Sequence, residues 1–503
     1  MGGREMKIIP STGYFHLYPE EGDTVDTSVY LGARVPRGCD HIIVENNMCN
    51  RILLGMPARL KDRPVEDIDV HGLKDYQIND VRKMVALGNV LNRNPMGLGK
   101  TVETIVTLRE AHVRNAVIVA PKIVLTQWAE QFKKWWPEKA KDVVVYETGV
   151  RVFDNNIAII NYEKLINRST LTKFKLFRWD AVVVDEAHRI KNADSQRTKA
   201  VKSIPARDHI ALTGTPILNK PDDLWSILHF IDPDYSGKSF WTFQNHFCHM
   251  VDGFFGRENK GLTTNPARVA LLNTLVEKVS VYNTVEVAKG KTHEIVKLPM
   301  GKEQKKLYKD MKDLVLDELP PGATIANGAV LTIRLAQTTS WPGLFIPDTP
   351  GPKFEWILDM CQDNPREKLL VFTRFAQSAE ALKNFLEGND INTVTLTGQL
   401  SDKLRATNLK AFLEDKYVQV LVGTIGAMGQ GTDGLQKVCH TCIFLDRDWS
   451  PEIMSQAEDR LNRWGQEQLV NVYILECEHS FDQHIGKVDM TKANDIREAL
   501  GND

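Results

Sequence analysis

The sequence predicts an α/β protein with two parallel β-sheets, a helical segment between them and a small strand-containing region in front. Short runs of β-branched and apolar residues alternate with helical stretches in residues 67–232, and the same alternation returns in residues 353–503. These runs carry almost no polar residue, as expected of parallel strands covered by helices on both faces. Residues 233–352 read instead as charged or aromatic helical stretches broken by proline and glycine, which indicates an insertion and a linker.

Length and composition exclude several classes of protein. The 503 residues correspond to roughly three domains, and 42% apolar with 25% charged residues is ordinary for a folded chain. The 63 basic and 65 acidic side chains give a net charge of −2, which excludes a histone-like basic carrier but allows a nucleic-acid binder with one positive surface. Seven cysteines, an odd number, and the lack of a membrane-length apolar run or signal-peptide core predict a soluble intracellular protein without disulfides.

Residues 1–66 are expected to form a small accessory region that contains strands. The runs Tyr14–Tyr18 and His41–Val44 have β-type composition and lie among turn-prone glycine, proline and aspartate residues. The region carries no motif that assigns it a role.

Eight buried strands are expected in the two α/β units. In the first unit they are residues 116–120, 143–146, 157–160 and 181–184. In the second unit they are residues 369–372, 393–396, 418–422 and 442–445. Between the units, a charged helix is expected over 302–319 and breaks are expected at 320–322 and 347–352.

A glycine-rich loop follows the apolar run 88–91 and opens a helical stretch over 102–110. In the pattern G-x-x-x-x-G-K-[ST], backbone N–H groups bind phosphate oxygens, the lysine reaches the β- and γ-phosphates and the hydroxyl binds Mg²⁺. Lys100 and Thr101 take these positions, and Asn94 replaces the first glycine. Asparagine is among the side chains that best tolerate a positive φ. For the loop alone, the alternative is a glycine-rich turn with a solvated lysine.

Two carboxylates, Asp185 and Glu186, follow the strand expected at 181–184. Ligands bind at the carboxyl edge of an α/β sheet. There Asp185 is predicted to hold Mg²⁺ and Glu186 to orient and deprotonate the attacking water. The alternative is a helix N-cap and first turn, where both residues are favourable. Together with the phosphate loop upstream, the pair indicates ATP hydrolysis.

With these two motifs, the chain resembles the Swi/Snf-related branch of superfamily-two helicases, which are ATP-driven translocases on double-stranded DNA. The similarity runs from about residue 73 to residue 466, and Asp185-Glu-Ala-His188 is the family's DEAH-type motif. The resemblance implies RecA-like folds for both units, with ATP-binding in 67–232. It assigns nucleotide contacts to Gln77, Met96, Gly97, Leu98, Gly99, Lys100 and Thr101, a DNA contact to Lys122, and coupling roles to His188, Thr213, Gly214 and Thr215.

The second unit continues the resemblance with motifs at residues 370–374, 396–398, 424–435 and 456–466. These imply a helicase C-terminal domain in 353–503. They assign DNA contacts to Arg374, Thr397 and Thr424, nucleotide contacts to Gly431 and Asp433, and catalytic arginine fingers to Arg460 and Arg463. Outside this motif, two arginines about one helical turn apart would indicate only a solvated basic face.

The chain departs from the family pattern at three places. The usual Asp-Glu before the phosphate loop is Asn94-Pro95. The usual arginine pair is missing in 281–287, which read Val-Tyr-Asn-Thr-Val-Glu-Val. In the motif at 424–435, Met428-Gly429 and Thr432-Asp433-Gly434 replace a glycine pair and Ile-Asn-Leu.

The resemblance implies a monomeric, DNA-stimulated ATPase that uses ATP and Mg²⁺ and moves on double-stranded DNA through phosphate contacts, remodelling DNA structures or displacing bound proteins. It implies a cytoplasmic, nucleoid or virus-infected host cell location. A strand-separating DNA or RNA helicase is the alternative enzyme, and an inactive DNA-binding scaffold is the alternative of another class.

Three further sequence patterns do not indicate one particular function. Cys439 and Cys442 have zinc-like spacing without a second pair, so core cysteines are expected. Residues 133–136 (Lys-Lys-Trp-Trp) mix charge and rings as single-strand binders do, but core packing of at least one tryptophan is expected. The basic residues in 189–202 face either DNA or solvent.

Overall fold

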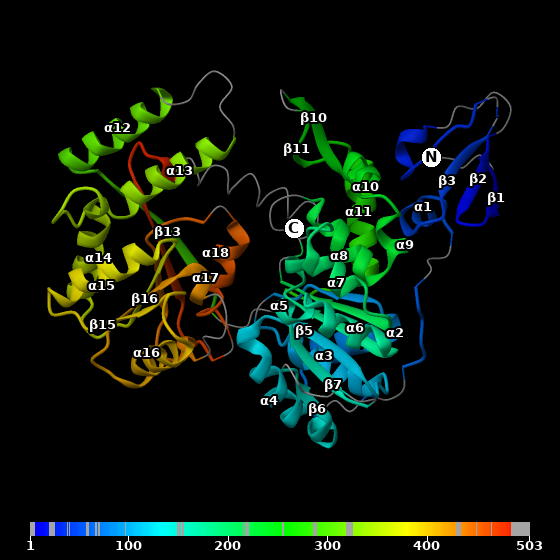
Figure 1. Ribbon diagram of the computed structural model, residues 1–503, viewed down its shortest axis with the longest axis horizontal. Helices are drawn as coiled ribbons and strands as arrows, with labels where there is room; N and C mark the ends of the chain where they lie inside the picture. Colours follow the sequence, from blue (N-terminus) through cyan, green and yellow to red (C-terminus); the bar gives the residue numbers. More distant parts are fainter. Residues whose placement is uncertain are drawn as a thin grey trace. The chain divides into compact units, whose positions relative to one another are not determined.

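The computed structural model describes most of the chain as two compact units (Figure 1). The described residues are 6–19, 26–37, 39, 41–56, 60–65, 68, 71–95, 97–147, 152, 155–214, 216, 221–253, 256–284, 289–317, 325–428, 434–448, 450–463 and 465–483. The first unit runs to Thr284 and the second follows it. Each unit is described by itself.

The N-terminal region of the first unit is a three-stranded antiparallel sheet with a short helix, which confirms the strands expected there. Its elements are β1 (Lys7–Ser11), β2 (Tyr14–Tyr18), β3 (Ile42–Glu45) and α1 (Met48–Leu53). Burial alternates along β2, as it should in a strand with one covered face. The covered face is formed by Phe15, Leu17, Ile42 and Val44.

The main sheet of the first unit has seven parallel strands in the order β12-β4-β9-β8-β5-β7-β6. Their bounds are β4 (Val90–Asn92), β5 (Ala116–Ala120), β6 (Val143–Val145), β7 (Ile157–Asn161), β8 (Trp179–Asp185), β9 (Ala206–Leu212) and β12 (Ser280–Val281). The four strands predicted for this unit are confirmed. Alternate residues of β5 enter two separate cores, Val117 and Val119 on one face and Ile118 and Ala120 on the other. Helices therefore cover both faces, as the apolar strands require.

Helices α2 (Asp75–Leu87), α3 (Lys100–Glu110) and α4 (Leu125–Trp135) pack on one face of this sheet. The other face is covered by α6 (Arg168–Leu176), α7 (Gln196–Lys202), α8 (Asp223–Ile231) and α11 (Pro266–Val279). The unit also contains α5 (Tyr162–Leu165), α9 (Pro233–Ser236), α10 (Phe240–Phe247) and a hairpin of β10 (Cys248–Gly253) and β11 (Gly256–Leu262).

The second unit holds six parallel strands in the order β13-β18-β17-β14-β16-β15. They are β13 (Lys291–Leu298), β14 (Leu369–Thr373), β15 (Thr393–Leu396), β16 (Val420–Thr424), β17 (Thr441–Phe444) and β18 (Val470–Cys477). The four predicted strands are confirmed. The helices are α12 (Lys302–Asp317), α13 (Ile325–Ser340), α14 (Pro352–Asp363), α15 (Ala376–Glu387), α16 (Asp402–Glu414), α17 (Ile425–Met428) and α18 (Pro451–Glu458).

The predicted helical insertion at 233–352 is divided between the two units. Helices α10 and α11 belong to the first unit, whereas β13, α12 and α13 belong to the second. The segment is also not purely helical, since it contributes the β10–β11 hairpin, β12 and β13. The domain boundaries stated from the sequence remain predictions. Among the described helices, none has the length and apolar character to cross a membrane.

Candidate active site

The phosphate loop lies between β4 and α3 and depends on glycine at two positions. Gly97 and Gly99 have φ values of 83° and 93°, in the left-handed region that favours glycine. A Cβ at Gly99 would also overlap the side-chain amide of Gln77. That amide donates to the Leu98 carbonyl at 3.0 Å, and the Gln77 carbonyl oxygen accepts from the Lys74 backbone at 3.1 Å. The structure therefore brings the predicted adenine contact against the phosphate loop.

Lys100 and Thr101 begin helix α3, where backbone N–H groups and the helix dipole favour an anion. The Lys100 ammonium donates to the carbonyls of Asn94 at 2.8 Å and Pro95 at 3.2 Å. These bonds hold the lysine across its own loop. Met96, also predicted for this site, lies outside the described residues.

Asp185 ends β8, and its carboxylate is fixed by two donors. The Trp128 indole donates to Oδ2 at 2.8 Å, and the Glu186 backbone N–H donates to Oδ1 at 3.0 Å. Burial and the neighbouring Glu186 carboxylate raise the pKa of Asp185 to about 6, although Lys100 acts in the opposite direction. Lys100 and Asp185 thus act on each other electrostatically within one site. A buried carboxylate of this kind is stabilised in its charged form by a divalent cation.

Glu186, His188 and Thr213 form a connected group beside Asp185. Glu186 has a φ of 53°, a left-handed conformation that is uncommon for a side chain of this kind. The Nδ1 atom of His188 lies 3.4 Å from a Glu186 carboxylate oxygen and 3.4 Å from the Thr213 hydroxyl. Burial lowers the pKa of His188 to about 4, so the ring is neutral at neutral pH. Two of the predicted coupling residues are therefore in contact, Gly214 follows Thr213, and Thr215 lies outside the described residues.

A buried network of amides and carboxyl groups lies beside the phosphate loop, and it joins two of the departures from the family pattern. The Asn94 amide donates to Asp80 at 2.7 Å and to Glu103 at 3.1 Å. Asn283, in the segment that lacks the arginine pair, donates to Asp80 at 2.6 Å and to Asn94 at 3.3 Å. Asn92 donates to Glu103 at 2.6 Å. Burial and Asp80 raise the pKa of Glu103 to about 8.

In the second unit, Arg460 and Arg463 lie in the turn that follows α18. Arg460 is buried, and the Arg463 guanidinium donates to the Asp459 carbonyl at 3.0 Å. Lys291 of β13 forms ion pairs with Glu458 at 2.9 Å and Asp459 at 2.8 Å. The edge strand therefore anchors the turn that carries both arginines.

The predicted DNA contacts all lie at the carboxyl ends of strands. Lys122 follows β5, Arg374 follows β14, Thr397 follows β15, and Thr424 ends β16. Thr397 is buried, and its hydroxyl has no hydrogen-bond partner in the described part of the chain. Their contact with DNA remains a prediction.

The predicted nucleotide contacts Gly431 and Asp433, in the altered motif, lie outside the described residues.

The less specific patterns have structural explanations. Cys439 and Cys442 are buried in the hydrophobic core, and burial raises the pKa of Cys439 to about 12. Trp135 packs against the core and donates to Gln131 at 3.1 Å. In the basic stretch, three side chains form ion pairs with acidic residues of the first unit. Lys191 binds Asp223 at 3.2 Å, Arg197 binds Glu163 at 3.4 Å, and Lys199 binds Asp194 at 3.5 Å.

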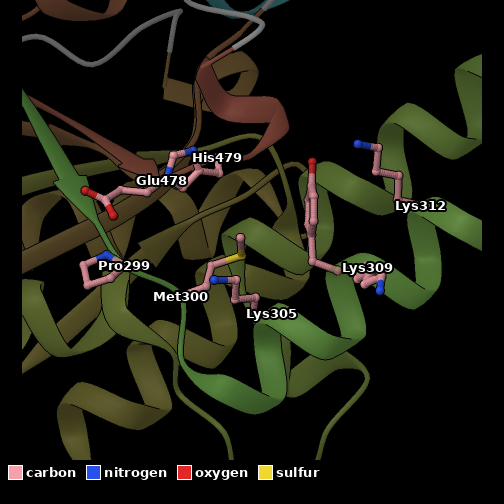
Figure 2. A pocket seen from close by; sticks show the side chains of 8 residues that line it. Pro299, Met300, Lys305, Lys309, Lys312, Glu478 and His479 are labelled. Atoms are coloured by element: carbon pink, nitrogen blue, oxygen red, sulfur yellow. The ribbon is translucent and has the colours of Figure 1, made fainter.

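A pocket of about 280 Å³ lies in the second unit, and none of the residues that line it is a predicted site residue (Figure 2). It is lined by Pro299, Met300, Lys305, Tyr308, Lys309, Lys312, Glu478 and His479. The three lysines share one face of α12 because they are spaced four and three residues apart. The Tyr308 hydroxyl accepts a hydrogen bond from the Phe481 backbone at 2.8 Å.

Comparison with known proteins shows the family to which the chain belongs. The family described as SNF2-related domain matches residues 76–338, and the helicase conserved C-terminal domain matches residues 352–465. A probable ATP-dependent DNA helicase of Arabidopsis thaliana, CHR12, is 30% identical over 449 residues, covering 80% of this chain and 40% of that protein. The human SWI/SNF-related matrix-associated actin-dependent regulator of chromatin subfamily A member 1 is 26% identical over 482 residues, covering 88% and 44%.

Among solved structures, the Sulfolobus solfataricus SWI2/SNF2 ATPase core in complex with dsDNA is 24% identical, with a TM-score of 0.41, covering 86% of this chain and 96% of that one. The chain spans less than half the length of the curated relatives named above. Because the SNF2-related domain alone matches more than half of the chain and a helicase C-terminal domain follows it, this protein belongs to the SNF2-related family and has the two-domain organisation of a nucleic-acid-dependent ATPase.

Proposed function

We propose that this chain is an ATP-driven motor that moves on double-stranded DNA and thereby remodels DNA structures or displaces bound proteins. The observation that carries the proposal is the joint site in the first unit, where Lys100 at the start of α3 is close enough to the Asp185 carboxylate at the end of β8 to lower its pKa, and Glu186 follows Asp185 directly. Such a site is suited to phosphoryl transfer, in which positioning and positive charge supply most of the catalysis.

The residues of the first unit fit ATP and Mg²⁺. Lys100 and the backbone N–H groups at the start of α3 would bind the phosphates, and Gln77 the base. The Thr101 hydroxyl and the Asp185 carboxylate are oxygen donors of the kind Mg²⁺ prefers, and they would hold it. The ion, when bound, neutralises charge on the phosphates. Glu186 would orient and deprotonate the water that attacks the γ-phosphorus.

The second unit would complete this reaction with Arg460 and Arg463. Their positive charge would stabilise the oxygens of the phosphoryl group during its transfer, and it comes from the other compact unit of the chain. ATP would then favour a closed arrangement of the units, and hydrolysis with release an open one. This alternation is the basis of movement along DNA.

Movement on any sequence requires contacts to the DNA backbone rather than to base edges. We assign these contacts to Lys122, Arg374, Thr397 and Thr424, each at the carboxyl end of a strand. The names of the relatives, a DNA helicase and a chromatin regulator, support a DNA substrate. We further propose that the chain works inside the cell as a monomer.

ATP hydrolysis measured with blunt duplex DNA and with single-stranded DNA tests the proposal. Blunt duplex is expected to stimulate turnover strongly, whereas stimulation by single strands alone would favour a strand-separating helicase. Lys100→Ala and Glu186→Gln are each expected to abolish turnover, and Glu186→Gln is expected to keep ATP binding. If the unaltered chain hydrolysed no ATP under any condition, the motor proposal would be wrong and a DNA-binding scaffold would be the better explanation.

A further inference from the structure

The N-terminal sheet presents aromatic side chains on the face opposite its core. Tyr14, His16 and Tyr18 alternate with the buried residues of β2 and are half-buried. The strand register places Ile9 and Ile43 beside His16 on this same face. In the described part of the chain, Ile9 is 40% exposed. The face is thus apolar and aromatic but open to solvent.

Three rings on this face form a continuous row. The Tyr18 and His41 rings are stacked, with centroids 4.8 Å apart and planes 26° apart. The His16 and His41 rings are 5.1 Å apart at 37°. Flat rings held in one row by their neighbours offer surfaces on which planar groups can stack.

Two cations lie beside Tyr14, on the same face as the row. The Arg34 guanidinium lies 5.1 Å from the centre of the Tyr14 ring, and the Lys238 ammonium lies 4.8 Å from it. Both side chains are exposed, as is Lys7, whose backbone pairs with Tyr18. The acid on this face is Glu45, which accepts hydrogen bonds from the Asn47 side chain and the Lys238 backbone, both at 3.4 Å. The carboxylates at 20, 21 and 23 lie outside the described residues.

We propose that this face, defined by Tyr14, His16, Tyr18, His41, Arg34 and Lys238, binds unpaired nucleotides. Bases stack on aromatic rings whatever their identity, and Arg and Lys side chains bind the phosphates between them. The charge of the described side chains complements a phosphate chain, and the rings complement its bases. This assignment rests on the proposed function. It implies that the N-terminal region directs the motor to DNA that contains unpaired segments.

Lys238 links the face to the main part of the first unit. It lies between α9 and α10, yet its ammonium reaches the Tyr14 ring, and a Cβ at Gly13 would lie 3.3 Å from it. A nucleotide bound on the face would therefore contact both the N-terminal sheet and the helical part of the ATP-binding unit.

The test compares the affinity of the full chain for a blunt DNA duplex with its affinity for the same duplex carrying an oligo-dT tail, by fluorescence anisotropy. The unaltered chain is expected to bind the tailed duplex at least about fivefold more tightly, the effect of one stacked base. The double variant Tyr18→Leu, His41→Leu is expected to lose this preference, because leucine keeps the apolar packing but has no flat ring on which a base can stack. Tyr18→Phe is expected to retain it.

Tyr417→Leu is the matched control, because Tyr417 is 68% exposed and lies under Lys416, 5.0 Å from the ring centre, in the second unit. It is expected to leave the preference unchanged. Equal affinity of the unaltered chain for both duplexes, or an unchanged preference in a correctly folded double variant, would overturn the inference. Duplex-stimulated ATP hydrolysis is measured on the same variants: its retention with no tail preference rejects this inference alone, and its absence from the unaltered chain rejects the proposed function.

Discussion

Asn94 and Asn283 show how two separate departures from a family pattern can compensate each other. Each amide donates to Asp80, and the two side chains are also hydrogen-bonded to one another. Glu103, whose pKa is about 8, is uncharged in most molecules at neutral pH. Lys83 acts on Asp80 and Lys100 acts on Glu103, so the network has positive charge nearby without an arginine.

An aspartate at position 94 would add a carboxyl group to this buried network. Asn94→Asp is expected to lower the free energy of unfolding by about 3 kcal/mol, since it places a third buried carboxyl group beside Asp80 and Glu103 and removes the amide donor to both. The double variant Asn94→Asp, Asn283→Arg is expected to recover much of the loss through an ion pair. Urea denaturation measures both effects.

Gln377→Glu is the control for this comparison, because it makes the same change from amide to carboxylate at an exposed position in the first turn of α15. It is expected to change stability little. The proposed compensation would be contradicted if Asn94→Asp were as stable as the unaltered protein. It would also be contradicted if adding Asn283→Arg lowered the stability of Asn94→Asp further.

The catalytic candidates could be named from the sequence because their chemistry fixes their spacing. Lys100 follows a glycine loop, and Asp185 with Glu186 ends an apolar strand, so local sequence identifies them. Asp80 and Glu103 could not be identified, because each looks like an ordinary polar position on an amphipathic helix. Their burial results from the packing of α2 and α3 around the loop, which no local pattern reveals.

At the scale of elements, three histidines besides His188, one buried and two half-buried, make the stability of the first unit depend on pH. His209 on β9, His229 on α8 and His246 on α10 each have a pKa lowered to about 4, mainly by burial. Because an unfolded histidine has a pKa near 6.5, the unfolded chain binds more protons as the pH falls. The stabilisation is fully present above about pH 6.5 and is lost as the pH falls through about 4.

The expected result is a free energy of unfolding that falls from pH 7 to pH 5, by up to about 1.4 kcal/mol per pH unit for each histidine. His246→Gln removes one side chain that takes up a proton on unfolding. The free energy of unfolding of this variant is therefore expected to depend less steeply on pH. Denaturant unfolding at several pH values measures it. The same slope in the variant would show that His246 does not take up a proton on unfolding.

Helix α14 is fixed in the second unit by one buried ion pair. The Lys353 ammonium lies 2.8 Å from Asp482 and donates to the Leu445 carbonyl at 2.7 Å. Lys353→Met is expected to lower the free energy of unfolding by about 3–5 kcal/mol, because it leaves the buried Asp482 carboxylate without its cation. Thermal unfolding compared with Lys297→Met, at an exposed position of β13, measures the effect. Equal stability of the two variants would contradict it.

Most strands with uninterrupted apolar sequences could be predicted, whereas strands that contain polar residues were missed, including the mostly buried β18 with Asn471 and Glu476. The eight predicted strands are apolar because helices cover both of their faces. Strand β13 is mostly exposed, yet it pairs with β18 along its full length from Lys291 to Leu298. Such an edge strand is stabilised by its pairing with the neighbouring strand and not by an apolar sequence. The sequence therefore predicts that this charged segment belongs to a helical insertion.

At the scale of the whole molecule, the sequence predicts two α/β units in their correct order but not where the connecting segment divides. The matching families cover residues 76–338 and 352–465, whereas the units separate after Thr284. The reason is physical. Helices α10 and α11 complete the core of the first sheet, and β13 completes the edge of the second, so these described parts of the segment belong to the two units rather than to a domain between them.

The account depends on one ATP being held by the first unit and hydrolysed with the help of Arg460 from the second. The most direct test is duplex-stimulated turnover of Arg460→Ala at saturating ATP, together with its affinity for ATP. Turnover is expected to fall by a factor of about 10³ or more, with only a modest loss of ATP affinity, while Arg366→Ala, at an exposed site of the same unit, keeps normal turnover. Normal turnover in Arg460→Ala would contradict the account.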